Sequence, residues 1–416
     1  MTEKPAALSH LKVLDLSRVL AGPWCTQMLA DLGADVIKVE RPGEGDDTRQ
    51  WGPPFLKDVQ GNNTDQATYF TACNRNKRSV TIDMAKPEGQ ALIRQMALQS
   101  DILVENFKVG GLARYGLDYA SLKVLNPRLI YCSITGFGQD GPYAQRAGYD
   151  LMIQAMSGMM SITGRADGVP GGGPLRLGVA LTDLMTGVYA ATAILAALEV
   201  RHRSGEGQLI DMALLDVGMA MLANQAAGFL NSGEVPQRQG NSHPSLAPYQ
   251  DFVTADGAML LAIGNDGQFA RFCAVAGHPE WAADPRYASN TLRVKHRDTL
   301  IPAMQEVTRQ RSTAQWLAVL EDQAVPCGPI NDIGQAFAEA QVAARNLVVK
   351  QPLEPERRAL TAIESIATVA SPLRLMATPV VLRRAPPALG EHTAQVLAEL
   401  GLEEAAVAKL RQAGVV

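Results

Sequence analysis

Short apolar segments that alternate with helix-sized segments constrain the fold of this chain most. Residues 11–16 (LKVLDL) and 34–39 (ADVIKV) have the composition of buried strands, and a helix-sized segment, residues 25–31, separates them. Two strands joined through a helix form a βαβ unit, whose strands lie parallel in one sheet. The first half is therefore predicted to be α/β, with an open, Rossmann-like parallel sheet.

The same alternation continues further along the chain. Three more apolar segments are predicted as strands: residues 79–84, 101–104 and 129–134. Residues 88–100 have helical periodicity, and the longest helical pattern covers residues 181–202. Residues 208–224 begin with a strand pattern and continue as a helix.

A change in composition marks the start of a second domain. Residues 228–248 are rich in Gly, Pro, Ser and Asn, which favour turns. Residues 249–264 contain two short alternating runs around an Ala-Asp-Gly turn, a pattern typical of a β-hairpin. Helical segments fill roughly residues 268–320. These features predict a smaller α+β domain.

The C-terminal segment is expected to return to the first domain. A second boundary lies near residues 325–329 (VPCGP), and short strands and two charged helices, 392–400 and 403–412, follow it. We predict residues 1–225 as the N-terminal part of the large domain, 226–330 as the small domain with linkers, and 331–416 as a linker and C-terminal part that rejoins the large domain.

Composition excludes several classes of protein. The formal net charge of the 416 residues is -4, without a basic stripe, so nucleic acid is not an expected partner. The 5 cysteines are scattered, which indicates reduced thiols and a cytoplasmic location. No two of the 6 histidines have metal-ligand spacing, so no metal site is predicted. The longest apolar run, residues 189–198, is shorter than a membrane span, so no membrane partner is expected.

One carboxylate stands at the start of the longest helical pattern. Asp183 lies between a glycine-rich turn (GGGPLRLG) and the almost wholly apolar residues 188–197. Unpaired backbone N–H groups and the helix dipole favour an anion at a helix N-terminus. An ionised, partly desolvated carboxylate there can attack an acyl group and become a covalent carrier. The alternative is that Asp183 only caps the helix.

A second glycine motif resembles a dinucleotide site but lacks its context. Residues 136–141 (GFGQDG) match G-x-G-x-x-G after a predicted strand. Pro142 follows at once, and the first βα turn has no glycine triplet, so nicotinamide or flavin is not expected. The segment is interpreted as a flexible turn that can lie beside a substrate.

Basic residues stand near several strand ends. Arg41 follows the second predicted strand, Arg114 follows the fourth, and Lys77 and Arg78 precede the third. Ligands of open α/β sheets bind beyond the carboxyl ends of the strands, and guanidinium groups suit phosphate. With Phe107 as a surface for a base or a pantetheine arm, these residues suit a ligand with several phosphates, such as coenzyme A. The alternative is that they are solvated surface charges.

These segments together resemble the class III CoA-transferase family (the formyl-CoA transferase and carnitine CoA-transferase type). The resemblance covers almost the whole chain and includes the segments LKVLDLSRVLAGPWCTQMLADLGADVIKVERPGEGDDTR, NRNKRSVTIDM, LVENFKVGGLARYG, GVALTDLMTG, GEGQLIDMALLD and LGEHTAQVLAELG. It implies an enzyme of acyl-CoA metabolism that forms an interlocked homodimer, in which each chain threads through the other. It also implies active sites between the large and small domains.

The resemblance implies roles for individual residues. Asp183 stands at the position of the family's aspartate nucleophile. The residues implied to bind CoA are Val19, Ala21, Arg41, Asn106, Phe107 and Arg114 in the channel, with Lys77 and Arg78 near the nucleotide end. Leu20 stands where some relatives have Gln, and residues 240–244 (GNSHP) stand where some have a glycine run. Neither that Gln's contribution nor the behaviour of the glycine run as a lid follows for this chain.

The implied reaction moves CoA from an acyl-CoA thioester to a carboxylic acid. It passes through an aspartyl mixed anhydride and an aspartyl-CoA thioester, with CoA as substrate and product and no tightly bound cofactor. Backbone N–H groups of Gly136 and Gly138 are candidates for stabilising the oxyanion. The segments GNSHPSLAPYQDF and VPCGPIND resemble those of members that act on dicarboxylates such as succinate and glutarate.

Two alternative functions stay open. Related α-methylacyl-CoA racemases transfer an α-proton and pair the aspartate with the His of a GHD motif, where this chain has Gly148, Tyr149 and Asp150. A tyrosine, with an ordinary pKa of about 10, is a poor general base at neutral pH, which favours the transferase over a racemase or isomerase. The other alternative is a non-catalytic acyl-CoA binder.

Overall fold

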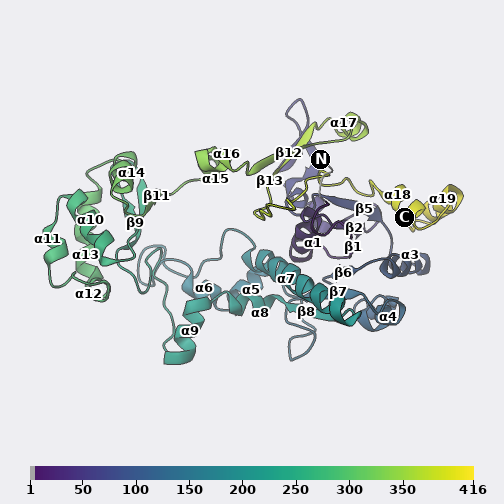
Figure 1. Cartoon of the computed structure of the whole chain (residues 1–416), viewed down its shortest axis with the longest axis horizontal. Helices are drawn as coiled ribbons and strands as arrows, with labels where there is room; N and C mark the ends of the chain where they lie inside the picture. The colour runs from purple at the N-terminus through teal and green to yellow at the C-terminus, as the bar shows by residue number, and fades with distance from the viewer. Residues whose placement is uncertain (1–4) are drawn as a thin grey trace. The chain divides into compact units, whose positions relative to one another are not determined.

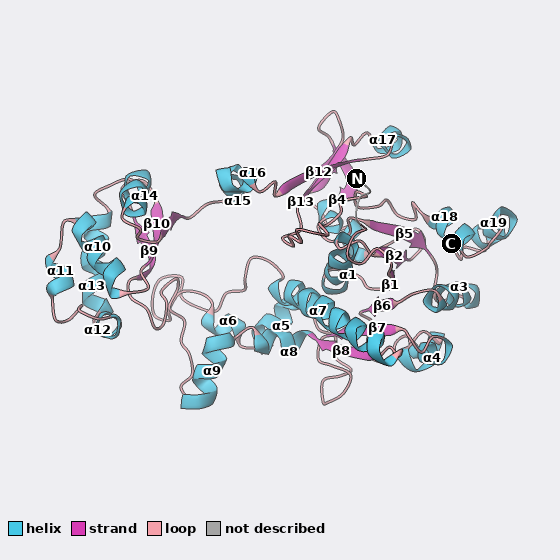
Figure 2. Cartoon of the chain, viewed as in Figure 1, coloured by secondary structure: helices cyan, strands magenta, loops and turns pink. Residues whose placement is uncertain are grey.

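The strands predicted in the first half form a 6-stranded sheet in the computed structural model, which describes residues 5–416. The strands are β1 (Lys12–Asp15), β2 (Asp35–Glu40), β5 (Lys77–Thr81), β6 (Ile102–Glu105), β7 (Ile130–Thr135) and β8 (Leu209–Ala213). Their order is β5-β2-β1-β6-β7-β8, and all neighbours are parallel (Figure 2). The strand order therefore reverses between β1 and β6, and the predicted α/β architecture with a parallel sheet is confirmed.

The chain divides into two units (Figure 1). The large unit consists of Met1–Gly158, Leu177–Ala226 and Ala343–Val416, and the small unit of Met159–Arg176 and Ala227–Val342. Both units are thus discontinuous in sequence. The domain boundaries expected at 225/226 and 330/331 stay predictions.

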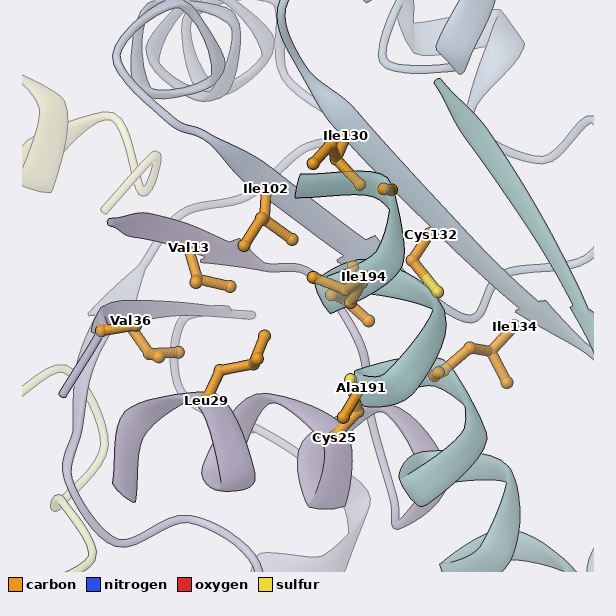
Figure 3. Close-up of a cluster of buried hydrophobic side chains, with 14 of the residues drawn as sticks. Val13, Cys25, Leu29, Val36, Ile102, Ile130, Cys132, Ile134, Ala191 and Ile194 are labelled. Carbon is orange, nitrogen blue, oxygen red and sulfur yellow. The ribbon is translucent and has the colours of Figure 1, made fainter. Parts of the chain in front are cut away.

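Two helices cover one face of the parallel sheet. Helix α1 (Ala21–Asp31) begins before the predicted residue 25, because a proline in the first helical turn removes only an N–H that has no intrahelical partner. Helix α7 (Leu181–Ser204) packs on α1 and on the strands, as Figure 3 shows for Ile194 and Ala191. A Cβ at Gly187 would lie 2.7 Å from the carbonyl oxygen of Ala21, so glycine permits the close approach of the two helices.

The opposite face of the sheet carries a second core. Side chains of α3 (Pro87–Leu98), α4 (Tyr119–Leu125) and α18 (Thr393–Glu399) pack there. Successive residues of a strand point to opposite faces, so Val13 belongs to the first core and Leu14 to the second. Burial of each such side chain stabilises the fold by about 1.5–3 kcal/mol, which fixes the register of β1.

The C-terminal segment packs on the edge of this sheet. The backbone N–H of His392 donates to the carbonyl oxygen of Ser79 on β5, and the Oγ1 of Thr393 accepts from the N–H of Thr81 at 3.0 Å. The segment also contains a hairpin, β12 (Val348–Pro352) with β13 (Ser365–Val369), and helix α19 (Glu404–Gln412).

The small unit contains the predicted hairpin and one strand that the sequence did not predict. Its 3-stranded antiparallel sheet consists of β9 (Tyr249–Val253), β10 (Ala258–Ala262) and β11 (Cys327–Pro329). Residues 325–329 were expected to form only a boundary, but β11 pairs with β10 at the edge of the sheet. An edge strand tolerates a terminal proline, because the missing N–H need not pair.

The small unit has an apolar core that includes Phe252 and Trp316. The helices of this unit are α6 (Met159–Ile162), α10 (Asp266–Ala276), α11 (Glu280–Ala283), α12 (Asn290–Lys295), α13 (Arg297–Thr308), α14 (Thr313–Asp322) and α15 (Ile333–Ala338). Of these, α10, α11, α13 and α14 contribute side chains to the core. Helices α9 (Ala223–Ser232) and α16 (Ala340–Ala344) cross the division between the units.

Shorter elements complete the large unit. They are η1 (Asp47–Arg49), β3 (Phe55–Lys57), β4 (Asn63–Ala67), α2 (Thr68–Thr71), η2 (Ala113–Tyr115), α5 (Asp150–Met156), α8 (Leu214–Ala220) and α17 (Pro355–Thr361). Helix α5 and the N-terminus of α7 are connected through side chains, and this connection determines the environment of Asp183.

Helix α7 is the one helix among residues 5–416 with the length and composition of a membrane span. Its 18-residue window has a mean hydropathy of 1.5, and 44% of that window is buried in the fold. Such a helix is weak evidence for a span, because core helices of soluble proteins have the same length and composition.

Candidate active site

A cavity of about 970 Å³ lies in the large unit at the carboxyl ends of the parallel strands. Its walls include residues that directly follow β1, β2, β6 and β7, among them Arg18, Arg41, Asn106 and Gly136. Beyond strand ends where the order reverses, as between β1 and β6, the outgoing loops separate and leave a crevice.

Most of the residues that the sequence predicted for the site line this cavity. They are Val19, Ala21, Arg41, Asn106, Phe107, Arg114, Gly136 and Asp183. They come from five separate stretches of the chain. Four of these stretches follow parallel strands, whose ends meet at one edge of the sheet, and Asp183 comes from the N-terminus of α7.

Lys77 and Arg78 do not line the cavity, contrary to their expected place near a nucleotide. The Nζ of Lys77 is buried and donates to Asp15 at 3.0 Å and to Asn74 at 2.8 Å. The Arg78 guanidinium pairs with Asp35 and Glu399. Both cations lie on β5 and hold the large unit together, so neither is available to a phosphate.

The two glycines expected at an oxyanion site differ in position. Gly136 lines the cavity, where a Cβ would lie 2.5 Å from the Cα of Gly148. Gly138 does not line it, and its N–H donates to the Oγ1 of Thr135 at 2.9 Å. Of the two, only Gly136 is placed to face a ligand.

Asp183 lies in the first turn of α7, but it does not cap the helix. The Oδ1 of Asp150, the first residue of α5, accepts a hydrogen bond from the backbone N–H of Thr182 at 2.9 Å. Asp150 therefore does from another helix what an N-cap side chain usually does. Among the described residues, no side chain or backbone group forms a hydrogen bond or ion pair with the Asp183 carboxylate, which lines the cavity.

The surroundings of Asp183 change its acidity. Burial raises its pKa from 3.8 to about 7, and the negative charge of Asp150 adds to the shift. Removing a carboxylate from water disfavours its charged form, as does a like charge nearby. Near neutral pH the protonated and ionised forms are therefore both populated, which is typical of a carboxyl group with a chemical role.

Cationic groups surround the cavity. Lys108, Arg114 and Arg146 line it without an ion pair among residues 5–416. The Arg146 guanidinium lies 4.4 Å from the centre of the Tyr143 ring, and Arg114 lies 4.5 Å from that of Tyr115. These groups can donate hydrogen bonds to phosphate or carboxylate oxygens, because no acidic side chain has to be displaced first.

The sequence did not single out Arg146 or Lys108, it assigned no role to Asp150, and it left the role of Tyr149 open. Arg146 lies on an irregular loop, where no periodicity indicates direction, and only its place three residues before Tyr149 connects it with the site. Tyr149 lines the cavity and remains 68% exposed. Leu20 lines it as well, at the position where some relatives have Gln.

The chain matches the family described as CoA-transferase family III over residues 8–393. It is 52% identical over 400 residues to succinate–glutarate CoA-transferase of Agrobacterium fabrum, covering 96% of this chain and 97% of that protein. It is 42% identical over 410 residues to succinyl-CoA:glutarate CoA-transferase of Homo sapiens, covering 98% and 90%.

Solved structures agree with the sequence relatives. A CAIB/BAIF family protein from Brucella suis is 48% identical, with a TM-score of 0.83 and coverage of 95% of this chain and 100% of that chain. Rv3272 from Mycobacterium tuberculosis is 28% identical, with a TM-score of 0.79 and coverage of 94% and 99%. With its matched residues spanning both units, the chain belongs to CoA-transferase family III and is a CoA-transferase.

Proposed function

We propose that the chain transfers CoA between dicarboxylic acids, from a donor such as succinyl-CoA to an acceptor such as glutarate, with Asp183 as the covalent carrier. One observation supports the carrier role above all. The Asp183 carboxylate faces a cavity with unpaired cations, while Asp150 caps its helix. Asp183 is thus not engaged in capping the helix, the usual role of a carboxylate at this position, and is free to react with a substrate.

The first half of the reaction moves CoA onto the enzyme. An Oδ atom of Asp183 attacks the thioester carbonyl carbon, the C–S bond breaks, and the sulfur leaves as CoA thiolate. The product is a mixed anhydride of the donor acid and Asp183. The bound thiolate then attacks the Cγ of Asp183, and the donor acid leaves as a carboxylate. Asp183 now carries CoA as a thioester.

The second half reverses these steps with a new acid. The acceptor carboxylate attacks the Cγ of Asp183 and displaces the thiolate, which gives a second mixed anhydride. The thiolate attacks the acceptor's carbonyl carbon, and Asp183 leaves as a carboxylate. Each step exchanges one anion for another without a net proton transfer. The reaction therefore needs an ionised Asp183, stabilisation of the oxyanion intermediates and exclusion of water.

The chemistry of the cavity and the names of the relatives support the choice of substrate. Lys108, Arg114 and Arg146 supply positive charge to a polyanionic thioester. The relatives from Agrobacterium fabrum and Homo sapiens are named for succinate and glutarate. The Gly136 N–H is a candidate donor to the oxyanion, and Val19, Ala21, Arg41, Asn106 and Phe107 are candidate CoA contacts.

Trapping with hydroxylamine tests the covalent carrier. Incubation with succinyl-CoA and hydroxylamine is expected to convert Asp183 to a hydroxamate, which peptide mass spectrometry locates. Asp183→Ala should lower kcat at least about a thousandfold, because no other group takes the acyl unit. Asp216→Asn is the matched control, since Asp216 also lies in the first turn of a helix but outside the cavity. Transfer that persists in Asp183→Ala overturns the covalent route.

A panel of acids tests the substrate class. With succinyl-CoA as donor, glutarate is expected to accept CoA faster than acetate or butyrate, because the second carboxylate can pair with a cavity cation. Acetyl-CoA and oxalyl-CoA serve as alternative donors. Preference for a monocarboxylate would contradict the dicarboxylate proposal and leave the carrier role intact.

A further inference from the structure

Val19 has a backbone conformation that its side chain opposes. Its φ is 68°, in the left-handed region, where a β-branched residue is rare and strained. It lies on the loop between β1 and α1 and lines the cavity together with Leu20 and Ala21. Strain of this kind persists only where the surrounding structure holds it in place, and it often occurs at functional sites.

Side chains from other parts of the chain hold this loop on both sides of Val19. The Val19 N–H donates to both carboxylate oxygens of Asp46, at 3.2 and 3.3 Å. The Nζ of Lys38 donates to the Ser17 carbonyl at 2.8 Å and pairs with Asp46 at 2.9 Å. The side chains of Lys38 and Asp46 are both 0% exposed, so solvent does not screen the pair.

The residue between these two attachment points is held as well. The Asn106 side chain accepts from the Arg18 N–H at 2.9 Å and donates to the Arg18 carbonyl at 2.7 Å. Asn106, which the resemblance places in the CoA channel, thus uses its amide on the loop itself. The loop backbone from Ser17 to Val19 is fixed before any ligand arrives.

We propose that the buried Lys38–Asp46 pair is a positioning device that holds Val19 in the left-handed conformation and thereby shapes the acyl-CoA site at residues 19–21. The role assigned to the site rests on the proposed function. Lys38 and Asp46 are among the residues that line the cavity, but their charges pair with each other, so we assign them no step of the reaction. When the Asp46 carboxylate is removed, Val19 relaxes to a negative φ, and the loop turns Leu20 and Ala21 away from the thioester.

Substitution of Asp46 separates positioning from catalysis. Asp46→Ala is expected to raise KM for succinyl-CoA about tenfold, with a smaller effect on KM for glutarate. Asp46→Asn keeps one acceptor for the Val19 N–H and should give a smaller rise, which keeps the test open if the alanine variant folds poorly. Asp35→Asn, which weakens a different ion pair of the large unit, is the matched control and should leave both KM values unchanged.

A second substitution tests whether the backbone of Val19 is the link. Glycine adopts a positive φ freely, so Val19→Gly in the Asp46→Ala chain should recover most of the affinity for succinyl-CoA. Val19→Ala also removes the branched side chain but keeps a Cβ, so it should recover much less. Equal recovery by glycine and alanine, or an unchanged KM in both Asp46 variants, overturns the proposal.

Ligand-free measurements separate this proposal from the proposed function. Hydrogen exchange of the Val19 amide should be slow in the wild type, faster in Asp46→Ala and unchanged in Asp35→Asn, whether or not the chain transfers CoA. Calorimetry with CoA alone should show equal affinities for the wild type and Asp35→Asn, and a lower affinity for Asp46→Ala. Failure of the wild type to transfer CoA would overturn the proposed function, whereas a slowly exchanging Val19 amide in Asp46→Ala would overturn the positioning role.

Discussion

The acidity of one carboxyl group determines how this enzyme is expected to respond to pH. Burial and the charge of Asp150 raise the pKa of Asp183 to about 7. Only the ionised carboxylate is a nucleophile, but an unpaired one is not weakened by a strong ion pair. At neutral pH only part of the Asp183 population is therefore ionised, but the ionised form is a stronger nucleophile than a carboxylate in an ion pair.

The pH dependence of kcat/KM is the corresponding prediction at the residue scale. Because the reactive form is deprotonated and the pKa is raised, kcat/KM should be constant well above pH 7 and fall about tenfold per pH unit well below it. Initial rates with succinyl-CoA between pH 5.5 and about 9 measure this, with protein stability checked at each pH. A profile that stays flat down to the lowest pH of this range would contradict the raised pKa.

At the element scale, the N-terminus of α7 depends on a side chain from α5. Asp150 accepts from the N–H of Thr182 and from the Nε2 of Gln154 at 2.7 Å. One carboxylate therefore joins two helices and influences the charge of a third residue, Asp183. Asp150 therefore affects both the stability of the α7 N-terminus and the pKa of Asp183.

Two substitutions of Asp150 separate these effects. Asp150→Asn keeps an acceptor for the N–H of Thr182 and removes the negative charge. The pH at which kcat/KM begins to fall should therefore move to a lower value. Asp150→Ala removes the cap and should lower the free energy of unfolding by about 1–2 kcal/mol. Rate profiles and denaturant titration measure the two outcomes, and an unchanged pH of this fall in Asp150→Asn would exclude the charge of Asp150 as a cause.

The contact between α1 and α7 gives a prediction about packing. Gly187→Ala places a methyl group 2.7 Å from the Ala21 carbonyl oxygen, so we expect a loss of about 1–3 kcal/mol in the free energy of unfolding. Gly228→Ala in α9 is the matched control, because its Cβ would meet nothing within 4 Å. That change should be neutral or slightly stabilising. Equal effects of the two substitutions would contradict the close approach.

At the scale of the whole molecule, we propose the interlocked homodimer that the resemblance implies. Apolar side chains on α7, including Tyr189, Leu195 and Val200, are 40–43% exposed in the single chain. A partner chain would bury such surface. The cytoplasmic location stays a prediction, and fractionation of the cells that make the protein would test it.

Sedimentation equilibrium tests the assembly. We expect a mass of twice the chain mass, and a dimer that dissociates only when the chains unfold, because threaded chains cannot separate while folded. Mixing two differently tagged dimers should therefore give no mixed dimers under native conditions. Rapid subunit exchange would contradict interlocking, and a monomer would contradict the dimer itself.

Local patterns in the sequence were sufficient to predict the strands of the parallel sheet and the place of Asp183 at the start of the long helix. Strand and helix periods depend on neighbours a few residues apart, so β1, α1, β2 and α7 follow from them. Parallel strands end at one edge, and for this reason Arg41 and Arg114, far apart in sequence, were expected at one site.

Only the tertiary structure decided what each charged group is free to do. Lys77 and Arg78 are residue types that often bind phosphate, yet both form ion pairs with carboxylates from other elements. Asp183 has the position of a helix cap, yet Asp150, 32 residues from the N–H it accepts, does the capping. A buried charge is available to a ligand only where nothing else pairs with it, and the partners of Lys77, Arg78 and Thr182 come from distant segments that no local pattern reveals.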